Sequence, residues 1–126
     1  MYDAPISLEL YTISLSQWRR AKELNIPLLD ITYKSGIQAL APSGKALGEY
    51  KKGLVTDEEY TKLYIQKMRN SFLDSPEVWE SLFLNKKLAL ACYCKAGVFC
   101  HRHILTELLV KYAKYKKYEL ILKGEL

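Results

Sequence analysis

The chain has 126 residues, of which 49% are hydrophobic and 26% are charged. Those values are typical of one ordinary globular domain, so we expect a single domain over residues 1–126 with a real core. No apolar run is long enough to span a bilayer, and the first residues show neither the basic nor the apolar segment of a secretory signal. Three cysteines, an odd number, argue against a disulfide framework. We therefore expect a cytoplasmic protein without a membrane partner.

The formal net charge of +5 comes from 19 lysines and arginines against 14 aspartates and glutamates. Much of the excess lies near the C-terminus, at Lys111, Lys114, Lys116, Lys117 and Lys123. Such a surface can attract phosphates or nucleic acid, but cations are also favoured near the C-terminal end of a helix dipole. No RNP, zinc-finger or helix-turn-helix signature accompanies the lysines. Nucleic-acid binding is therefore the weaker hypothesis.

The first third of the chain predicts a strand, a helix and a second strand. Residues 8–13 alternate and are rich in strand formers. Ser14 and Gln17 fit a capping box for a helix that stops at Asn25, a residue that tolerates the left-handed conformation. Residues 27–33 then have the composition of a second strand.

The middle of the chain predicts a loop followed by helices. Residues 34–43 contain glycine and proline and lack periodicity, and residues 44–50 can form a short helix. Thr56 and Glu59 form a second capping box ahead of a longer helix, and Pro76 stands at the first position of another helix, after Ser75 as its N-cap.

The last third predicts a strand over 87–94, a helix over 100–114 and a short final strand over 118–122. Strands that alternate with helices in this way are typical of a parallel core. We therefore predict an α/β fold, a single-domain Rossmann-like three-layer sandwich with a short, mainly parallel sheet.

The junction between the strand over 87–94 and the next helix gathers reactive and cationic groups. Strand alternation places Cys92 and Cys94 on one face, and helical periodicity places His101 on the inward stripe and His103 toward water. Arg102 lies at the edge of that stripe. Ligand sites of open α/β sheets lie at such junctions, so we expect the site here.

Three kinds of chemistry compete for this junction. The first is anion recognition by the helix N-terminus, Arg102 and Lys95. The second is a metal site, but C-x-C-x5-C-H is not the usual zinc spacing, so we predict no metal and no cofactor. The third is nucleophilic catalysis by Cys94 or Cys100, with His101 as base or acid. For Cys92, simple burial as a small apolar residue is the preferred interpretation.

Other strand ends should feed the same crevice. Ser14 and Ser16 follow the first strand, and Asp30 follows the second, where it can bind a ribose hydroxyl or cap a nearby loop. Trp18 can stack on a base, although core packing is the better interpretation. The complete set of candidate ligand-binding residues is Ser14, Ser16, Asp30, Thr32, Lys34, Cys94, Lys95, Cys100, His101 and Arg102.

These residues resemble domain-of-unknown-function family 488 over nearly the whole chain. The resemblance rests on Tyr11-Thr-Ile-Ser-Leu-Ser16, Asp30-Ile-Thr32 and the element Cys94 to Cys100-His-Arg102, which is its most specific part. It implies an α/β fold in which the three motifs meet at one edge of the sheet, and it implies no particular reaction. Thr32 stands where the family usually has arginine, and Ser14 where it usually has glycine. Genes for related proteins tend to lie near genes of DNA processing, stress or phage–host conflict, which makes nucleotide-like ligands plausible.

The sequence leaves two main functions, of which we favour the first. One is binding of a nucleotide-derived or other phosphorylated small molecule at the C-terminal edge of the sheet, as a sensor or a sequestering sponge. The other is an enzyme that acts on such a molecule through a Cys/His/Arg site. The ten tyrosines are compatible with a homo-oligomer that buries some of them between subunits, and equally with tyrosines on a free surface.

Overall fold

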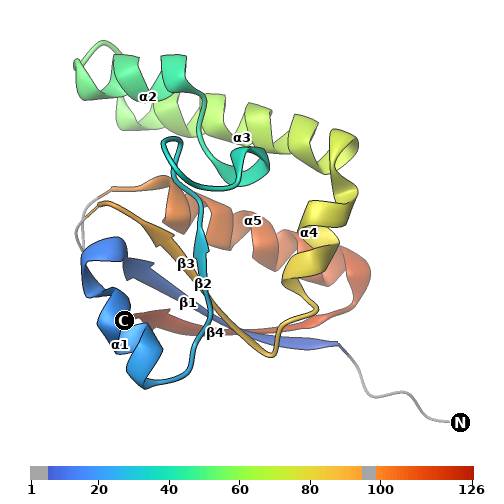
Figure 1. Ribbon diagram of the computed structural model, residues 1–126. Helices are drawn as coiled ribbons and strands as arrows, with labels where there is room; N and C mark the ends of the chain where they lie inside the picture. Colours follow the sequence, from blue (N-terminus) through green and yellow to red (C-terminus); the bar gives the residue numbers. More distant parts are fainter. Residues whose placement is uncertain (1–5, 95–98) are drawn as a thin grey trace, which may run out of the picture.

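The computed structural model describes residues 6–94 and 99–126 (Figure 1). Its secondary-structure elements, in chain order, are β1 (Ser7–Ser14), the 3-10 turn η1 (Leu15–Gln17), α1 (Trp18–Glu23), β2 (Leu28–Asp30), the 3-10 turn η2 (Gln38–Leu40), α2 (Gly44–Lys51), α3 (Asp57–Asp74), α4 (Pro76–Leu82), β3 (Lys87–Cys92), α5 (His101–Lys116) and β4 (Glu119–Glu125). Every element predicted from the sequence is present, and their bounds shift by a few residues.

The four strands form one parallel sheet with the order β2-β3-β1-β4. The central strand β3 is apolar and buried along almost its whole length, as expected for a parallel strand covered on both faces. Helix α1 covers one face of the sheet, and α2 to α5 lie on the other (Figure 1). The protein therefore has the predicted α/β fold, a Rossmann-like sandwich.

The two faces of the sheet bury cores of different size. The face under α1 holds a small cluster built on Ile13, Ala21 and Ile26, with two alanines of β3. The opposite face holds the main core, in which Tyr64, Leu105 and other side chains of α3, α4 and α5 pack on β1 and β3. Most apolar burial, and so most of the stabilisation that it supplies, lies on the α5 face.

Local signals explain some of the helix ends. Ser75 stands at the predicted N-cap of α4, with Pro76 at the first helical position, but its side chain makes no capping hydrogen bond. The side chains of Thr56 and Glu59 form the predicted capping box at the start of α3, and Asn25 stops α1 with a φ of 57°. The predicted capping box at Ser14 is wrong, because the chain first forms the turn η1 and the Ser14 hydroxyl bonds to Ser16 instead, at 3.1 Å.

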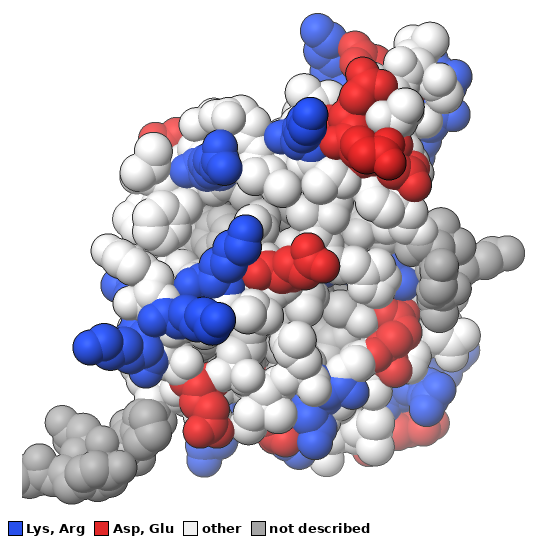
Figure 2. Space-filling view, turned by 180° about the vertical axis from the view of Figure 1, so that it is seen from behind, with Lys and Arg blue, Asp and Glu red and all other residues white. Residues whose placement is uncertain are grey.

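Two surface properties complete the description. Within the described residues, no helix is long and apolar enough to cross a membrane. On the face shown in Figure 2, lysines and arginines are interspersed with aspartates and glutamates, so the net positive charge is not segregated into a single basic field there.

Candidate functional site

The carboxyl ends of the parallel strands bring the predicted motifs to one edge of the sheet. Register pairs Ser14 of β1 with Cys92 of β3, and Asp30 of β2 with Ala91 beside it. Helix α5 begins at the same edge, one residue after Cys100. The expectation that the three sequence motifs converge is therefore met by the sheet order and by the register.

Three free cysteines form a cluster at this edge, and we call Cys92, Cys94 and Cys100 the thiol cluster. Their sulfur atoms all lie within 4.8 Å of one another, and those of Cys92 and Cys100 are 2.6 Å apart. Cys92 and Cys100 are buried, whereas Cys94 is only half-buried. Thiolates are ligands that zinc and other soft metals prefer, so these three sulfurs are the described group placed to hold such an ion.

The thiols of Cys94 and Cys100 differ in how readily they ionise. Hydrogen bonds with Cys100 and Cys92 lower the pKa of Cys94 well below the ordinary thiol value, although burial opposes them. The positive charges of Arg102 and Lys51 lower this pKa further. The same contacts and burial raise the pKa of Cys100. The arrangement thus favours a thiolate at Cys94 held by neutral thiol donors.

His101 is buried between β2 and α3. Its Nε2 lies 2.7 Å from the carbonyl oxygen of Ile31, which can only accept a hydrogen bond, so Nε2 carries the proton. In the neutral ring Nδ1 is then unprotonated, and it lies 3.7 Å from the sulfur of Cys100. Burial lowers the pKa of His101, although the bond to Ile31 opposes this, so the ring is a neutral acceptor toward the thiol cluster.

Arg102 is fully buried behind the thiol cluster. Its Nη1 donates to the sulfur of Cys92 at 2.8 Å and to the carbonyl oxygen of Cys94 at 3.1 Å, and two further donors reach the carboxylate of Glu125. This guanidinium therefore places a fixed positive charge against the sulfurs. These contacts are with protein groups, and Arg102 does not line the adjacent cavity.

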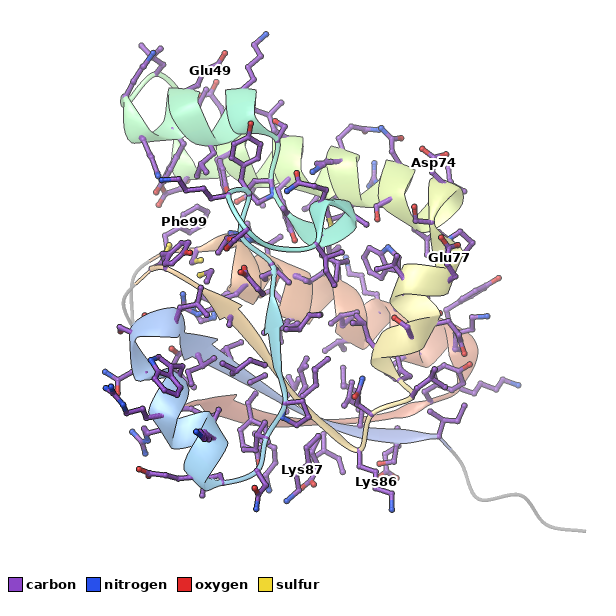
Figure 3. The ribbon with its side chains drawn as sticks, in the orientation of Figure 1. Glu49, Asp74, Glu77, Lys86, Lys87 and Phe99 are labelled. Carbon is purple, nitrogen blue, oxygen red and sulfur yellow. The ribbon has the colours of Figure 1, made fainter. Side chains whose placement is uncertain are left out.

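A cavity of about 210 Å³ opens beside the thiol cluster. Its floor is formed by the cluster with Thr32 and His101, and its other walls come from the loop after β2 and from α2 and α3. The ring centroid of Tyr50 lies 4.8 Å from that of Tyr60 and 5.6 Å from that of Phe99. Figure 3 shows Phe99 next to sulfur atoms at this edge of the sheet. Lys51 adds an exposed cation, so the cavity has aromatic walls, a floor lined by thiols and a lysine at its rim.

This chain matches a family model over residues 12–113, and the description of that model is the active DUF488-N3 subclade, DUF488-N3a. The chain belongs to the DUF488 family. The matched span includes the thiol cluster and all of α5 except its last turn, whereas Glu125 lies beyond it. No curated protein and no solved structure matches the chain.

Of the residues that sequence reasoning singled out in this DUF488 protein, five lie in the walls of the cavity. These are Thr32, Cys92, Cys94, Cys100 and His101. His103 faces water, as predicted from the helical period. Lys95 lies outside the described residues, and Lys34 is exposed and away from the cavity walls.

Asp30 has a structural task in this DUF488 protein. Its carboxylate accepts hydrogen bonds from the backbone N–H of Thr32 at 2.9 Å and from the Ser35 hydroxyl at 2.6 Å, which hold the turn after β2. Burial opposes ionisation, but these bonds lower the pKa of Asp30. Of the two interpretations offered by the sequence, the geometry therefore favours the loop cap over contact with a sugar. Ser14 and Ser16 bond to each other and do not line the cavity.

Sequence reasoning missed the walls that α2 and α3 supply. Tyr60 falls on a helical apolar stripe, which predicts core packing and carries no signal for a cavity. Tyr50 and Lys51 lie in a short helix with no distinctive motif. Their approach to β3 depends on tertiary packing over some forty residues, which local patterns do not encode.

Proposed function

We propose that the cavity binds a small nucleotide-like or otherwise phosphorylated molecule and that Cys94 acts on it as a nucleophile. The observation that carries this proposal is the half-buried Cys94, which faces the cavity and whose thiolate is favoured by Cys92, Cys100 and Arg102. A thiolate, rather than a thiol, is the reactive form of cysteine. The description of the matched family model as an active subclade agrees with a catalytic role.

The chemistry of the walls supports the ligand class. Aromatic rings such as Tyr50, Tyr60 and Phe99 offer flat apolar surface to a base, and Lys51 offers a cation to a phosphate. Helix α5 has 16 residues, so its N-terminus adds backbone donors and a positive dipole end at the thiol cluster. A cavity of this volume accommodates a base or a small phosphorylated metabolite better than a folded nucleic acid.

In this scheme the sulfur of Cys94 bonds to an electrophilic atom of the ligand, and the displaced group departs with the electron pair. Water then attacks the same atom, and the carbon–sulfur or phosphorus–sulfur bond breaks to regenerate the Cys94 thiolate. Arg102 stabilises the thiolate before the attack through its fixed charge. His101, neutral and oriented by Ile31, presents its unprotonated Nδ1 toward the sulfur of Cys100 and positions that side chain beside the cluster. Free thiols at the centre of such a site suit a reducing compartment such as the cytoplasm.

A second candidate is binding without turnover, as a sensor or sponge. It is favoured by a specific observation, namely that the side chains of His101 and Arg102 are both engaged by protein groups. Neither is therefore arranged as an obvious general base for Cys94.

One experiment separates the two candidates. A Cys94→Ser variant is equilibrated with a mixture of nucleotides and phosphorylated metabolites, and the retained molecule is identified by native mass spectrometry followed by denaturation. That molecule is then offered to the wild-type protein. A chemically altered product supports the enzyme, and quantitative recovery of the unchanged molecule supports the binder. If the Cys94→Ser variant retains no component of the mixture, both candidates are wrong.

A further inference from the structure

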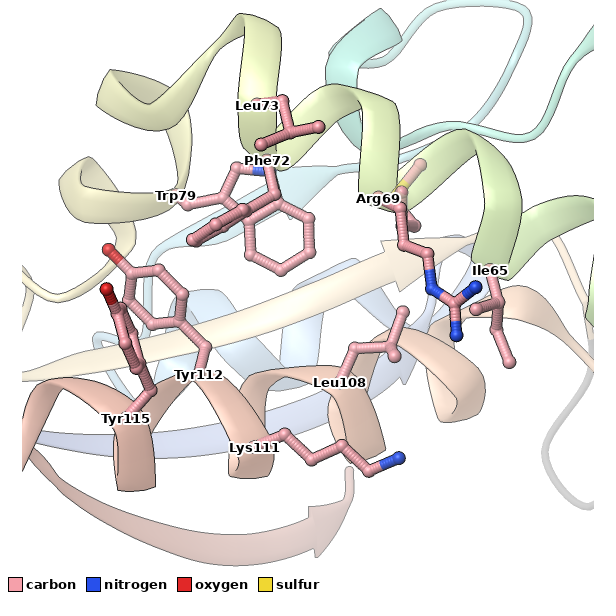
Figure 4. Close-up of a pocket in the computed structure, with 10 residues that line it drawn as sticks. Ile65, Arg69, Phe72, Leu73, Trp79, Leu108, Lys111, Tyr112 and Tyr115 are labelled. Atoms are coloured by element: carbon pink, nitrogen blue, oxygen red, sulfur yellow. The ribbon is translucent and has the colours of Figure 1, made fainter.

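A second and larger cavity lies on the helical face of the molecule, between α3, α4 and α5 (Figure 4). Its volume is about 680 Å³, which is within the range of small-molecule sites. Within the described residues it shares no wall with the cavity at the thiol cluster. The proposed chemistry at Cys94 therefore leaves this groove unexplained.

The groove is mainly aromatic and aliphatic. The Phe72 ring lies edge-on to Trp79, Tyr112 and Tyr115, with centroid distances of 6.1, 5.9 and 6.5 Å. At its margin Leu73 is 73% exposed and Tyr115 is 74% exposed. A cluster of large apolar side chains left open to water is typical of a binding surface.

Two cations stand at one end of this apolar groove. Figure 4 shows the guanidinium of Arg69 and the ammonium of Lys111 on the side of Ile65 and Leu108, with the aromatic rings at the other end. Among the described residues, neither cation has an ion pair or a side-chain hydrogen bond. The groove thus separates an apolar end from a positive end.

We propose that the groove binds a small amphipathic anion, with its carboxylate or phosphate between Arg69 and Lys111 and its apolar body on Phe72 and Tyr115. Burial of the apolar body supplies most of the affinity, and the two cations fix the orientation of the head. An amphipathic anion fits a groove with cations at one end and apolar walls at the other. A neutral lipid would leave the cations without a partner, and a polar metabolite would leave the apolar walls uncovered.

Charge also argues against a second copy of the chain as the occupant. A symmetric contact through this groove would bury Arg69 and Lys111 of both copies against a lining that carries no carboxylate, in a protein whose net charge is already +5. Charges that are buried in an interface without partners of opposite sign weaken association. A small anion instead neutralises the charge at that end of the groove.

The test uses decanoate as the probe and 1-decanol as its neutral counterpart, both titrated into the full chain. The Trp18→Phe variant keeps Trp79 as its single tryptophan, so fluorescence reports from the groove itself. We expect saturable binding of decanoate with one site per chain. In the Arg69→Gln/Lys111→Gln double variant, decanoate should bind about tenfold more weakly, while binding of decanol stays unchanged.

The matched control is the Lys62→Gln/Lys114→Gln double variant, which removes two exposed cations of α3 and α5 outside the groove. It should bind decanoate as the wild type does, which excludes a simple effect of net charge. Three results each overturn the proposal: no saturable binding of decanoate, equal loss in both double variants, or sedimentation as a dimer in which Trp79 no longer responds.

Discussion

Arg102 and Glu125 form a two-armed ion pair across 23 residues of sequence. Nε and Nη2 of the arginine donate to the two carboxylate oxygens at 3.2 and 3.1 Å, and the Thr12 hydroxyl donates to one of them at 2.5 Å. The same guanidinium touches the sulfur of Cys92. The end of β4 is thereby fastened to the beginning of α5, and the positive charge is held against the thiol cluster.

Replacement of this carboxylate should therefore destabilise the fold. Glu125→Gln leaves the buried guanidinium with a neutral partner, so the free energy of unfolding should fall. We expect a moderate loss of about 2 kcal/mol, because Glu125 itself is partly solvated. Urea denaturation measures the loss. The control is Glu9→Gln, which breaks the more exposed pair with Lys123 and should cost about 0.5 kcal/mol or less. Equal losses in the two variants would show that the Arg102–Glu125 pair stabilises the fold no more than the exposed Lys123–Glu9 pair does.

Two glycine substitutions should act in opposite directions. A Cβ atom on Gly36 would lie 2.4 Å from the carbonyl oxygen of Asp30, so Gly36→Ala should displace the turn after β2 and cost about 2 kcal/mol or more. Gly48 lies within α2, and a Cβ there meets nothing within 4 Å. Gly48→Ala should therefore stabilise the protein by about 0.5–1 kcal/mol. Thermal and urea unfolding of both variants test the pair, and a stabilising Gly36→Ala would contradict the described turn.

The stability of the protein should fall as the pH drops below about 6.5, the ordinary pKa of histidine. Burial lowers the pKa of His101 in the folded state, so the unfolded chain binds the proton first. The contribution of His101 is then complete above its unfolded pKa and declines below it, by at most about 1.4 kcal/mol per pH unit. The Cys94 thiolate, whose pKa is also lowered, adds a decline of its own that begins below the ordinary thiol pKa.

Variants at the two histidines identify the source of this pH dependence. His101→Gln should flatten the decline between about pH 5 and about pH 7, whereas replacement of the exposed His103 by glutamine should leave it intact. The measurement is urea denaturation at a series of pH values. An unchanged slope in His101→Gln would exclude this residue as the titrating group.

Lys51 should tune the reactivity of Cys94 from the rim of the cavity. Its charge helps to lower the pKa of Cys94 to about 3, so Lys51→Gln should raise that pKa and slow alkylation in acidic solution near it, at about pH 3–4. The neighbouring Lys52 is also exposed but does not line the cavity, and Lys52→Gln is the matched control. Alkylation rates resolved by peptide mass spectrometry compare the two. An identical slowing in both variants would indicate a general effect of surface charge.

Local patterns account for most of the fold. The apolar run of β3 and the stripe of α5 that carries His101 are legible because a strand repeats every two residues and a helix every 3.6. Trp18 shows the limit of such patterns, since it was expected in the core but is exposed, with the guanidinium of Arg19 over its ring at 4.8 Å. A short helix that covers only a small core needs few buried side chains.

The site was predictable as a set of residues, but not as an arrangement. The sequence places Cys94, Cys100 and Arg102 at one strand-to-helix junction, and parallel strands guarantee that Ser14 and Asp30 end nearby. It places Arg102 at the edge of the inward stripe but carries no signal that the side chain is fully buried, because that depends on a carboxylate brought close by the pairing of β4 with β1. The sequence shows which residues are charged, whereas the topology of the sheet determines which charged residues meet.

The most direct test of the account is the rate at which iodoacetamide modifies Cys94, followed by peptide mass spectrometry between about pH 6 and about pH 8. A Cys94 thiolate that is already formed should react at nearly the same rate across this range, and faster than Cys100, whose pKa is raised. An ordinary thiol would instead gain about tenfold per pH unit. A nearly flat profile supports Cys94 as the nucleophile of the cavity, and a tenfold rise per pH unit would contradict it.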